Sequence, residues 1–154
     1  MKLKPNIFFS FANALCLMQL VGMLIYLALA WNSLPEQIPG HFGADGVVTR
    51  YDGRGALLVM PIMNWIMFGV ISLIERFPQT WNVGVKVTEE NKLLVYGIIR
   101  NLIVTVKLVI VTAFTFIGIV QSLAQNLPSM FLPVLLVSLF GSLIYWTIRL
   151  RMAR

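Results

Sequence analysis

The chain has 154 residues, of which 58% are hydrophobic, with 12 lysines and arginines against 6 acidic residues. Charged residues make up 12% of the sequence, whereas a soluble globular domain usually carries roughly a quarter. This composition excludes an ordinary soluble domain, and the one cysteine excludes a disulfide framework.

Long stretches without charge, or with a single one, predict four transmembrane helices, because about 20 apolar residues span a bilayer core of roughly 30 Å. We expect an all-α fold: a polytopic, integral membrane four-helix bundle with an ordered extracytoplasmic loop between helices one and two. The whole chain, 1–154, is predicted to form a single transmembrane domain. Its helices are placed at about 7–31, 56–75, 88–123 and 127–149, and the outer loop at 32–55.

The first helix is interpreted as retained rather than cleaved, because its apolar run exceeds the 7–15 residues of a signal peptide. Small or polar side chains recur along it at helical spacing, which favours close packing against a neighbouring helix. This predicted stripe consists of Ala12, Cys16, Gln19, Gly22 and Tyr26. Gln19 is expected to bond a neighbouring helix, with a role in transport as the alternative.

The loop that follows is predicted to be a stiff, bent arm and then a sharp turn. Pro35 and Pro39 each disfavour helical geometry in the preceding residue, and the segment 43–46 supplies turn residues. Its apolar side chains are expected to face inward as anchors; they are Leu34, Ile38 and Phe42. His41 is then expected at the base of the turn, bonded to a backbone carbonyl, to Asp45 or to Asp52.

The second helix contains two residues that are unusual in a membrane span. Pro61 is expected to kink it, and Asn64 to face the bundle, because an unpaired amide in lipid is costly. The third helix is expected to begin at Thr88 as its N-cap, with Glu89 and Glu90 in its first turn, and to project beyond the membrane.

Deeper in the third helix, Arg100 and Lys107 share one face, with Arg100 at the cytoplasmic boundary. We expect Lys107 to extend toward that boundary, and the alternative pairs it with a polar group of another helix. In the fourth helix, Pro133 lies near the outer end, and Gly141 with Ser142 predicts close packing midway.

The basic residues predict the orientation, because positive charge collects on the cytoplasmic side. Arg50 and Arg54 fall on one side of the membrane. The other side holds Lys2, Lys4, Arg76, Lys86, Lys92, Arg149, Arg151 and Arg154. Both termini are therefore predicted to be cytoplasmic, and the excess basic charge indicates membrane topology rather than nucleic-acid binding.

The motif "LPEQIPGHFGADG" at 34–46 resembles a bacterial membrane domain of unknown function. That domain also forms the first part of SdpI-type immunity proteins, which protect a producing cell from its own secreted antimicrobial peptide. The matching positions are Leu34, Pro35, Ile38, Pro39, His41, Phe42 and Gly46, and more loosely Tyr51, Gly53 and Arg54. Thr49 stands where that family usually has Asp. The resemblance implies a multi-pass protein of the bacterial cytoplasmic membrane and an immunity function.

No nucleophile–base pair or phosphate-binding glycine loop is identifiable, so we expect no enzyme and no cofactor. His41 with Glu36, Asp45 and Asp52 is a weak metal signal, and no metal is predicted. The favoured hypothesis is an interaction protein whose partners are the lipid bilayer and either a membrane-active peptide or another membrane protein. Association with a second copy of the chain stays open as an alternative.

The residues expected to bind the partner are Pro35, Pro39, His41, Phe42, Asp45, Tyr51 and Arg54. A second hypothesis is a small transporter or an accessory subunit with a polar path through the bundle, drawing on Gln19, Asn64, Arg100 and Lys107. The two hypotheses differ in whether the polar side chains converge on one cavity or lie in separate packing interfaces.

Overall fold

The computed structural model describes residues 5–153, which form four long helices and one β-hairpin. The helices are α1 (Ile7–Ala30), α2 (Val59–Glu75), α3 (Lys92–Ser122) and α4 (Phe131–Met152). Each of these helices, with its flanking turns, is long and apolar enough to cross a membrane. The predicted class is confirmed: this is a mostly helical, multi-pass membrane protein.

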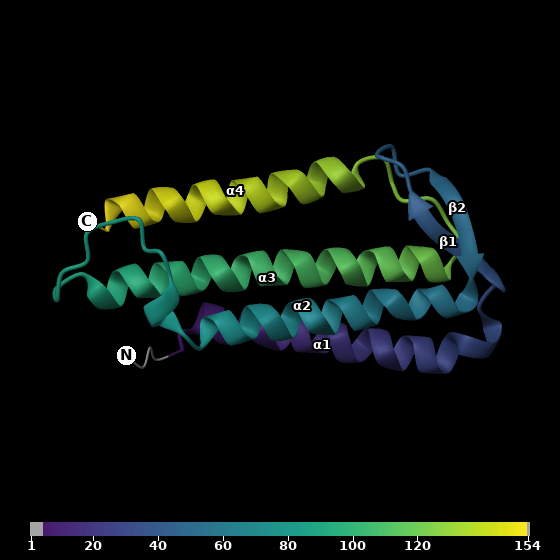
Figure 1. Ribbon diagram of the computed structural model, residues 1–154, viewed down its shortest axis with the longest axis horizontal. Coiled ribbons are helices and arrows are strands. Elements are labelled where there is room, and N and C mark those ends of the chain that lie inside the picture. Colours follow the sequence, from purple (N-terminus) through teal and green to yellow (C-terminus); the bar gives the residue numbers. More distant parts are fainter. Residues whose placement is uncertain (1–4, 154) are drawn as a thin grey trace.

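The start of α1 and the end of α4 lie at one end of the molecule, and the hairpin lies at the opposite end (Figure 1). Arg76, Lys86, Lys92, Arg149 and Arg151 lie at or near the end away from the hairpin, which is the arrangement that the predicted orientation needs. Lys2, Lys4 and Arg154, which also entered that prediction, lie outside the described residues. Which end faces the cytoplasm stays a prediction.

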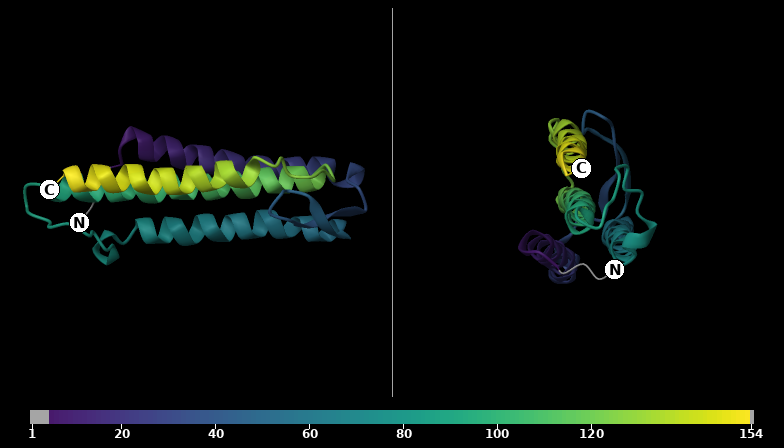
Figure 2. Two further views of the ribbon diagram at one scale, coloured as in Figure 1. Left: turned by 90° about the horizontal axis from the view of Figure 1, so that it is seen from above. Right: turned by 90° about the vertical axis from the view of Figure 1, so that its left-hand side faces the viewer.

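The helix α3 is the centre of the assembly, with α1, α2 and α4 arranged around it (Figure 2). It has 31 residues, or about 46 Å at roughly 1.5 Å per residue, which exceeds the bilayer core. In contrast, α4 packs mainly against α3 and contains no fully buried residue. The helices α1, α2 and α3 therefore form a closely packed unit, and α4 lies on one side of it against α3.

Helix α1 contacts α3 through a stripe that differs in part from the predicted one. Its buried residues are Ala12, Cys16, Leu20, Met23 and Leu27. Ala12 and Cys16 were expected, but Gly22 is exposed and Met23 takes its place. The close approach is provided by Gly118 of α3, where an added Cβ would press on the side chains of Met23 and Met60.

The structure differs from the expectations at three helix details. Pro61 lies in the first turn of α2, after the 3-10 turn Arg54–Leu58, where its missing N–H leaves no gap in the helix ladder. The helix α3 begins at Lys92 rather than at Thr88, but Thr88 does cap the turn that leads into it: Thr88 Oγ1 accepts from the Asn91 amide, and Asn91 Oδ1 accepts from the Thr88 amide. Gly141 lies exposed on α4, with nothing within 4 Å of an added Cβ.

The outer loop is ordered, and it forms an antiparallel hairpin of β1 (Gln37–Phe42) and β2 (Val48–Gly53). The strands pair from Gln37 with Gly53 to Phe42 with Val48, and the register is irregular on both sides of His41. The strand Gln37–Phe42 is the extended arm expected from the prolines, and its pairing with the segment after the turn was not predicted.

Candidate functional site

The base of the hairpin is anchored in an apolar cluster at the outer ends of α1 and α2. Ile38 is 0% exposed and Leu34 is 7% exposed, and both pack with Leu27 and Leu57. Phe42, the third predicted anchor, is only partly buried. The predicted inward-facing anchors are thus found at Leu34 and Ile38, and they fix the arm to the helices.

The tip of the hairpin is docked on the far end of α3 and on the segment that joins α3 to α4. The side chain of Gln121 donates a hydrogen bond to the Pro39 carbonyl at 2.8 Å. The Leu127 amide donates to the Gly46 carbonyl at 2.9 Å, and the Val48 amide donates to Asn126 Oδ1 at 2.8 Å. These three hydrogen bonds to the end of α3 and to the α3–α4 connection hold the hairpin in a single position.

Gly46 is required at this contact for two reasons. Its φ is +84°, a conformation that other residues rarely adopt. A Cβ at this position would also overlap the Leu127 carbonyl oxygen. The turn can therefore approach the α3–α4 connection this closely only with glycine at position 46.

Several polar side chains of the hairpin, and the aromatic Tyr51, are exposed. His41 Nδ1 lies 2.7 Å from Thr49 Oγ1, so the expectation of a carbonyl, Asp45 or Asp52 as its side-chain partner is wrong. Asp52 pairs instead with Arg50 at 2.9 Å. Thr49, on the opposite strand, is therefore the residue that holds the His41 ring, and its hydroxyl also lies 3.3 Å from the His41 carbonyl oxygen.

The residues predicted to bind a partner separate into two groups. Pro35, His41, Asp45 and Tyr51 are exposed, and Tyr51 is 56% exposed. Their side chains are accessible to another molecule. The remaining predicted residues, described below, serve largely to hold the hairpin in place.

Pro39 is buried beneath the hairpin, where its carbonyl accepts the bond from Gln121. Arg54 donates to the Trp31 carbonyl at 3.0 Å and lies over the Trp31 ring, 5.3 Å from its centroid. The guanidinium thereby fastens the end of the hairpin to the end of α1. Phe42 turns toward the underside of the hairpin, where it lines a cavity.

That cavity lies between the hairpin turn, the end of α3 and the start of α4, and its volume is about 390 Å³. Its walls are mostly apolar and include Phe42, Met60, Ile117, Leu127 and Phe131, and the exposed His41 lines it as well. Gln121 also lines it and is 4% exposed. Within residues 5–153, Gln121 Oε1 is a buried acceptor with no hydrogen-bond donor.

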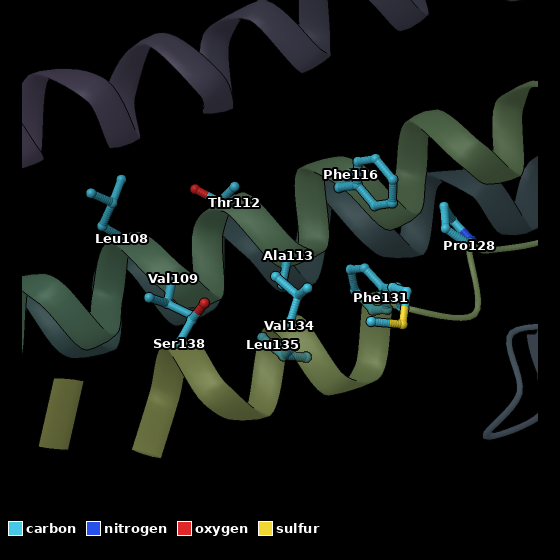
Figure 3. A pocket seen from close by; sticks show the side chains of 11 residues that line it. Leu108, Val109, Thr112, Ala113, Phe116, Pro128, Phe131, Val134, Leu135 and Ser138 are labelled. Atoms are coloured by element: carbon cyan, nitrogen blue, oxygen red, sulfur yellow. The ribbon is translucent and has the colours of Figure 1, made fainter. Parts of the chain in front are cut away.

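A second hollow, of about 440 Å³, lies between α3 and α4 (Figure 3). Apolar side chains from both helices face it, and Phe116 stacks on Phe131 with ring centroids 5.4 Å apart. Its lining includes the hydroxyl-bearing Thr112 and Ser138. Such a surface suits contact with apolar chains.

Lys107 lies at the centre of a polar cluster within the helices. Its side chain is 0% exposed, so the expectation that it extends to the boundary is wrong. The ammonium group donates to Glu75 Oε2 and Asn13 Oδ1, each at 2.6 Å, and to Ser72 Oγ at 3.1 Å. An ammonium group has three N–H donors, and here each has an acceptor on α1 or α2.

The other predicted intramembrane polar residues occupy different places. Asn64 is 1% exposed and donates to the Val111 carbonyl and to Thr115, so it faces the bundle as expected. Gln19 bonds the Leu15 carbonyl of its own helix rather than a neighbouring one. Arg100 is 6% exposed, with its guanidinium 4.7 Å from the centroid of the Phe9 ring.

Several of these partners were missed from the sequence. Glu75 follows directly on an uncharged run, and a single acidic residue at that place is a signal for a partner of the single lysine in the third span. Gln121, Asn126 and Leu127 fall in and after the end of α3, and nothing in their local sequence indicates that a hairpin rests on them.

The family match among the comparisons with known proteins falls on the same region. Residues 18–64 match a family described as "Domain of unknown function (DUF1648)", a segment that covers the second half of α1, the hairpin and the start of α2. An uncharacterized protein of Archaeoglobus fulgidus is 31% identical over 94 residues, which is 54% of this chain and 51% of that protein. The chain thus spans about half the length of this curated relative. No solved structure matches the chain.

Proposed function

We propose that the protein is an SdpI-like membrane interaction protein of the cytoplasmic membrane. Its outer hairpin, residues 37–53, recognises a membrane-active peptide, and this recognition gives immunity to the peptide or reports its presence. The proposal rests on one observation above all: the hairpin is tied to the helices along its underside and leaves His41, Tyr51 and Asp45 exposed. A rigid display of this kind lowers the entropy cost of binding a partner.

The matched family segment supports the proposal, because it is centred on the same hairpin. The immunity function itself comes from the resemblance of the loop motif to SdpI-type proteins. A hairpin needed only to cap the bundle would require the buried residues and the docking bonds. It would not require an exposed histidine fixed by a cross-strand threonine, or an exposed tyrosine beside them.

The transporter hypothesis is less well supported. Lys107, Asn64 and Gln19 make their hydrogen bonds in three separate places, with the α1–α2 polar cluster, with α3, and within α1 itself. A continuous polar path would bring such groups to one aqueous cavity. We therefore assign these three side chains to packing.

The test is a self-protection assay in the organism that encodes the protein. A deletion strain and its complemented counterpart are grown in cell-free medium conditioned by the same organism, and survival and membrane potential are measured. We expect the deletion strain to lose membrane potential and viability in conditioned medium only. Equal survival of both strains across all growth phases, with no transcriptional response to the medium, would contradict the proposal.

A further inference from the structure

One face of α4 carries a groove near the end of the helix that lies away from the hairpin (Figure 1). The groove has a volume of about 270 Å³, and within residues 5–153 it is lined by α4 alone. Its residues are Leu143, Ile144, Thr147, Ile148 and Arg151. The three apolar side chains are 39%, 61% and 53% exposed, so this face of a predicted membrane span is open to lipid.

The side chains of this face change from apolar to polar to charged toward the end of α4. Leu143, Thr147 and Arg151 follow one another at intervals of four residues, or about 6 Å along the helix axis. A phospholipid presents the same order, with an acyl chain, then an ester group and then a phosphate. Arg151 belongs to the last turn of a helix of 22 residues, whose length of about 33 Å matches a bilayer core of roughly 30 Å. Its guanidinium therefore reaches the depth of the lipid headgroups.

The two polar side chains of the groove have hydrogen-bonding capacity to spare. Arg151 is exposed, and no acidic side chain within residues 5–153 forms an ion pair with it. The Thr147 hydroxyl makes no hydrogen bond in the same part of the chain, whereas Ser142 of the same helix donates to the Leu139 carbonyl. A guanidinium suits phosphate oxygens, because it offers paired N–H donors together with a fixed positive charge.

We infer that this face of α4 binds one anionic phospholipid, with its phosphate on Arg151, an ester oxygen accepting from Thr147 and an acyl chain along the apolar part of the groove. Arg76, Lys86 and Arg149 add positive charge at or near the same end, which favours a headgroup with net negative charge over a zwitterionic one. The larger hollow between α3 and α4 has no charged lining residue within the described chain, so it lacks this headgroup contact. The lipid site lies opposite the hairpin and does not depend on the proposed function.

The test is native mass spectrometry of the full chain in detergent micelles, titrated with 1-palmitoyl-2-oleoyl-phosphatidylglycerol. Phosphatidylcholine with the same acyl chains is the zwitterionic comparison. We expect saturable binding of one phosphatidylglycerol, with an affinity about fivefold or more above that for phosphatidylcholine. Arg151→Gln should lower the affinity for phosphatidylglycerol about tenfold, because a charge-assisted hydrogen bond is lost. Thr147→Val should lower it less, since it removes one neutral hydrogen bond.

Arg149→Gln is the matched control. It removes the same charge from the same exposed turn but does not line the groove, so the affinity should stay within about twofold of wild type. Equal losses in Arg149→Gln and Arg151→Gln would overturn the inference, because they would show a diffuse attraction to the basic end. Equal affinity of the wild-type protein for the two lipids, or no saturable binding of phosphatidylglycerol, would also overturn it.

Discussion

Lys107 Nζ and Glu75 Oε2 lie 2.6 Å apart, with the two side chains 0% and 6% exposed. The pair joins α3 to the last residue of α2, and Asn13 brings α1 to the same point. Each ion would be costly if left alone in this environment, so the pair specifies how the three helices are rotated against one another. The Lys107–Glu75 pair, together with Asn13, thus connects α1, α2 and α3 through polar contacts.

Replacing one member of this pair should destabilise the protein strongly. Lys107→Met leaves the Glu75 carboxylate buried without its cation, and we expect a loss of about 3 kcal/mol in the free energy of unfolding, measured in detergent. Lys107→Met combined with Glu75→Gln should cost less than the sum of the single changes, because the uncompensated charge is then gone. Lys92→Met, which breaks the exposed pair with Glu89, is the control and should have little effect. Additive costs in the double variant would contradict a coupled pair.

Gly46→Ala should loosen the tip of the hairpin. An alanine at φ +84° costs about 1–2 kcal/mol, and its Cβ would overlap the Leu127 carbonyl. We expect faster hydrogen exchange at the Leu127 amide, which donates to Gly46. Gly53→Ala is the matched control, because Gly53 has φ −65° and an added Cβ meets nothing within 4 Å. Unchanged exchange at Leu127 in Gly46→Ala would show that the close contact is dispensable.

The four spans were predictable because hydropathy and length are properties of each segment alone. The pairing of Glu75 with Lys107 was not, because it depends on how α2 and α3 are rotated and staggered. The hairpin was missed for a different reason: Pro39 sits inside β1, and proline argues against a strand in the middle of a sheet. In a two-stranded ribbon both strands are edges, so the missing N–H is tolerated, and the irregular register beside Pro39 accommodates its ring.

A substitution of His41 can distinguish a hairpin that only caps the helix bundle from a hairpin that recognises a partner. Its exposed ring is held by Thr49, and neither side chain belongs to the anchoring cluster. We expect His41→Ala to abolish protection in conditioned medium while the melting temperature and the amount of protein in the membrane stay close to wild type. Thr49→Val keeps the side-chain shape, removes the hydroxyl and should weaken protection partially. Full protection by His41→Ala would remove His41 from the site.

The predicted orientation can be tested with single cysteines, because Cys16 is 0% exposed and should not react. Ala44→Cys lies exposed in the hairpin turn, and Gln79→Cys lies exposed between α2 and α3. In intact cells, a membrane-impermeant maleimide should label position 44 and label position 79 only after the membrane is opened. Labelling of both positions in intact cells, or of position 79 alone, would contradict cytoplasmic termini.

The most direct measurement of hairpin recognition is photo-crosslinking from Tyr51, which is 56% exposed on β2. A photoreactive phenylalanine analogue at position 51 is activated in living cells in conditioned medium, with the same analogue at Val137, a 73% exposed position on α4, as the lipid-facing control. The account predicts a discrete peptide adduct from position 51, lost in His41→Ala, and no such adduct from position 137. Crosslinks from position 51 to lipid alone, in cells that the protein still protects, would contradict recognition by the hairpin.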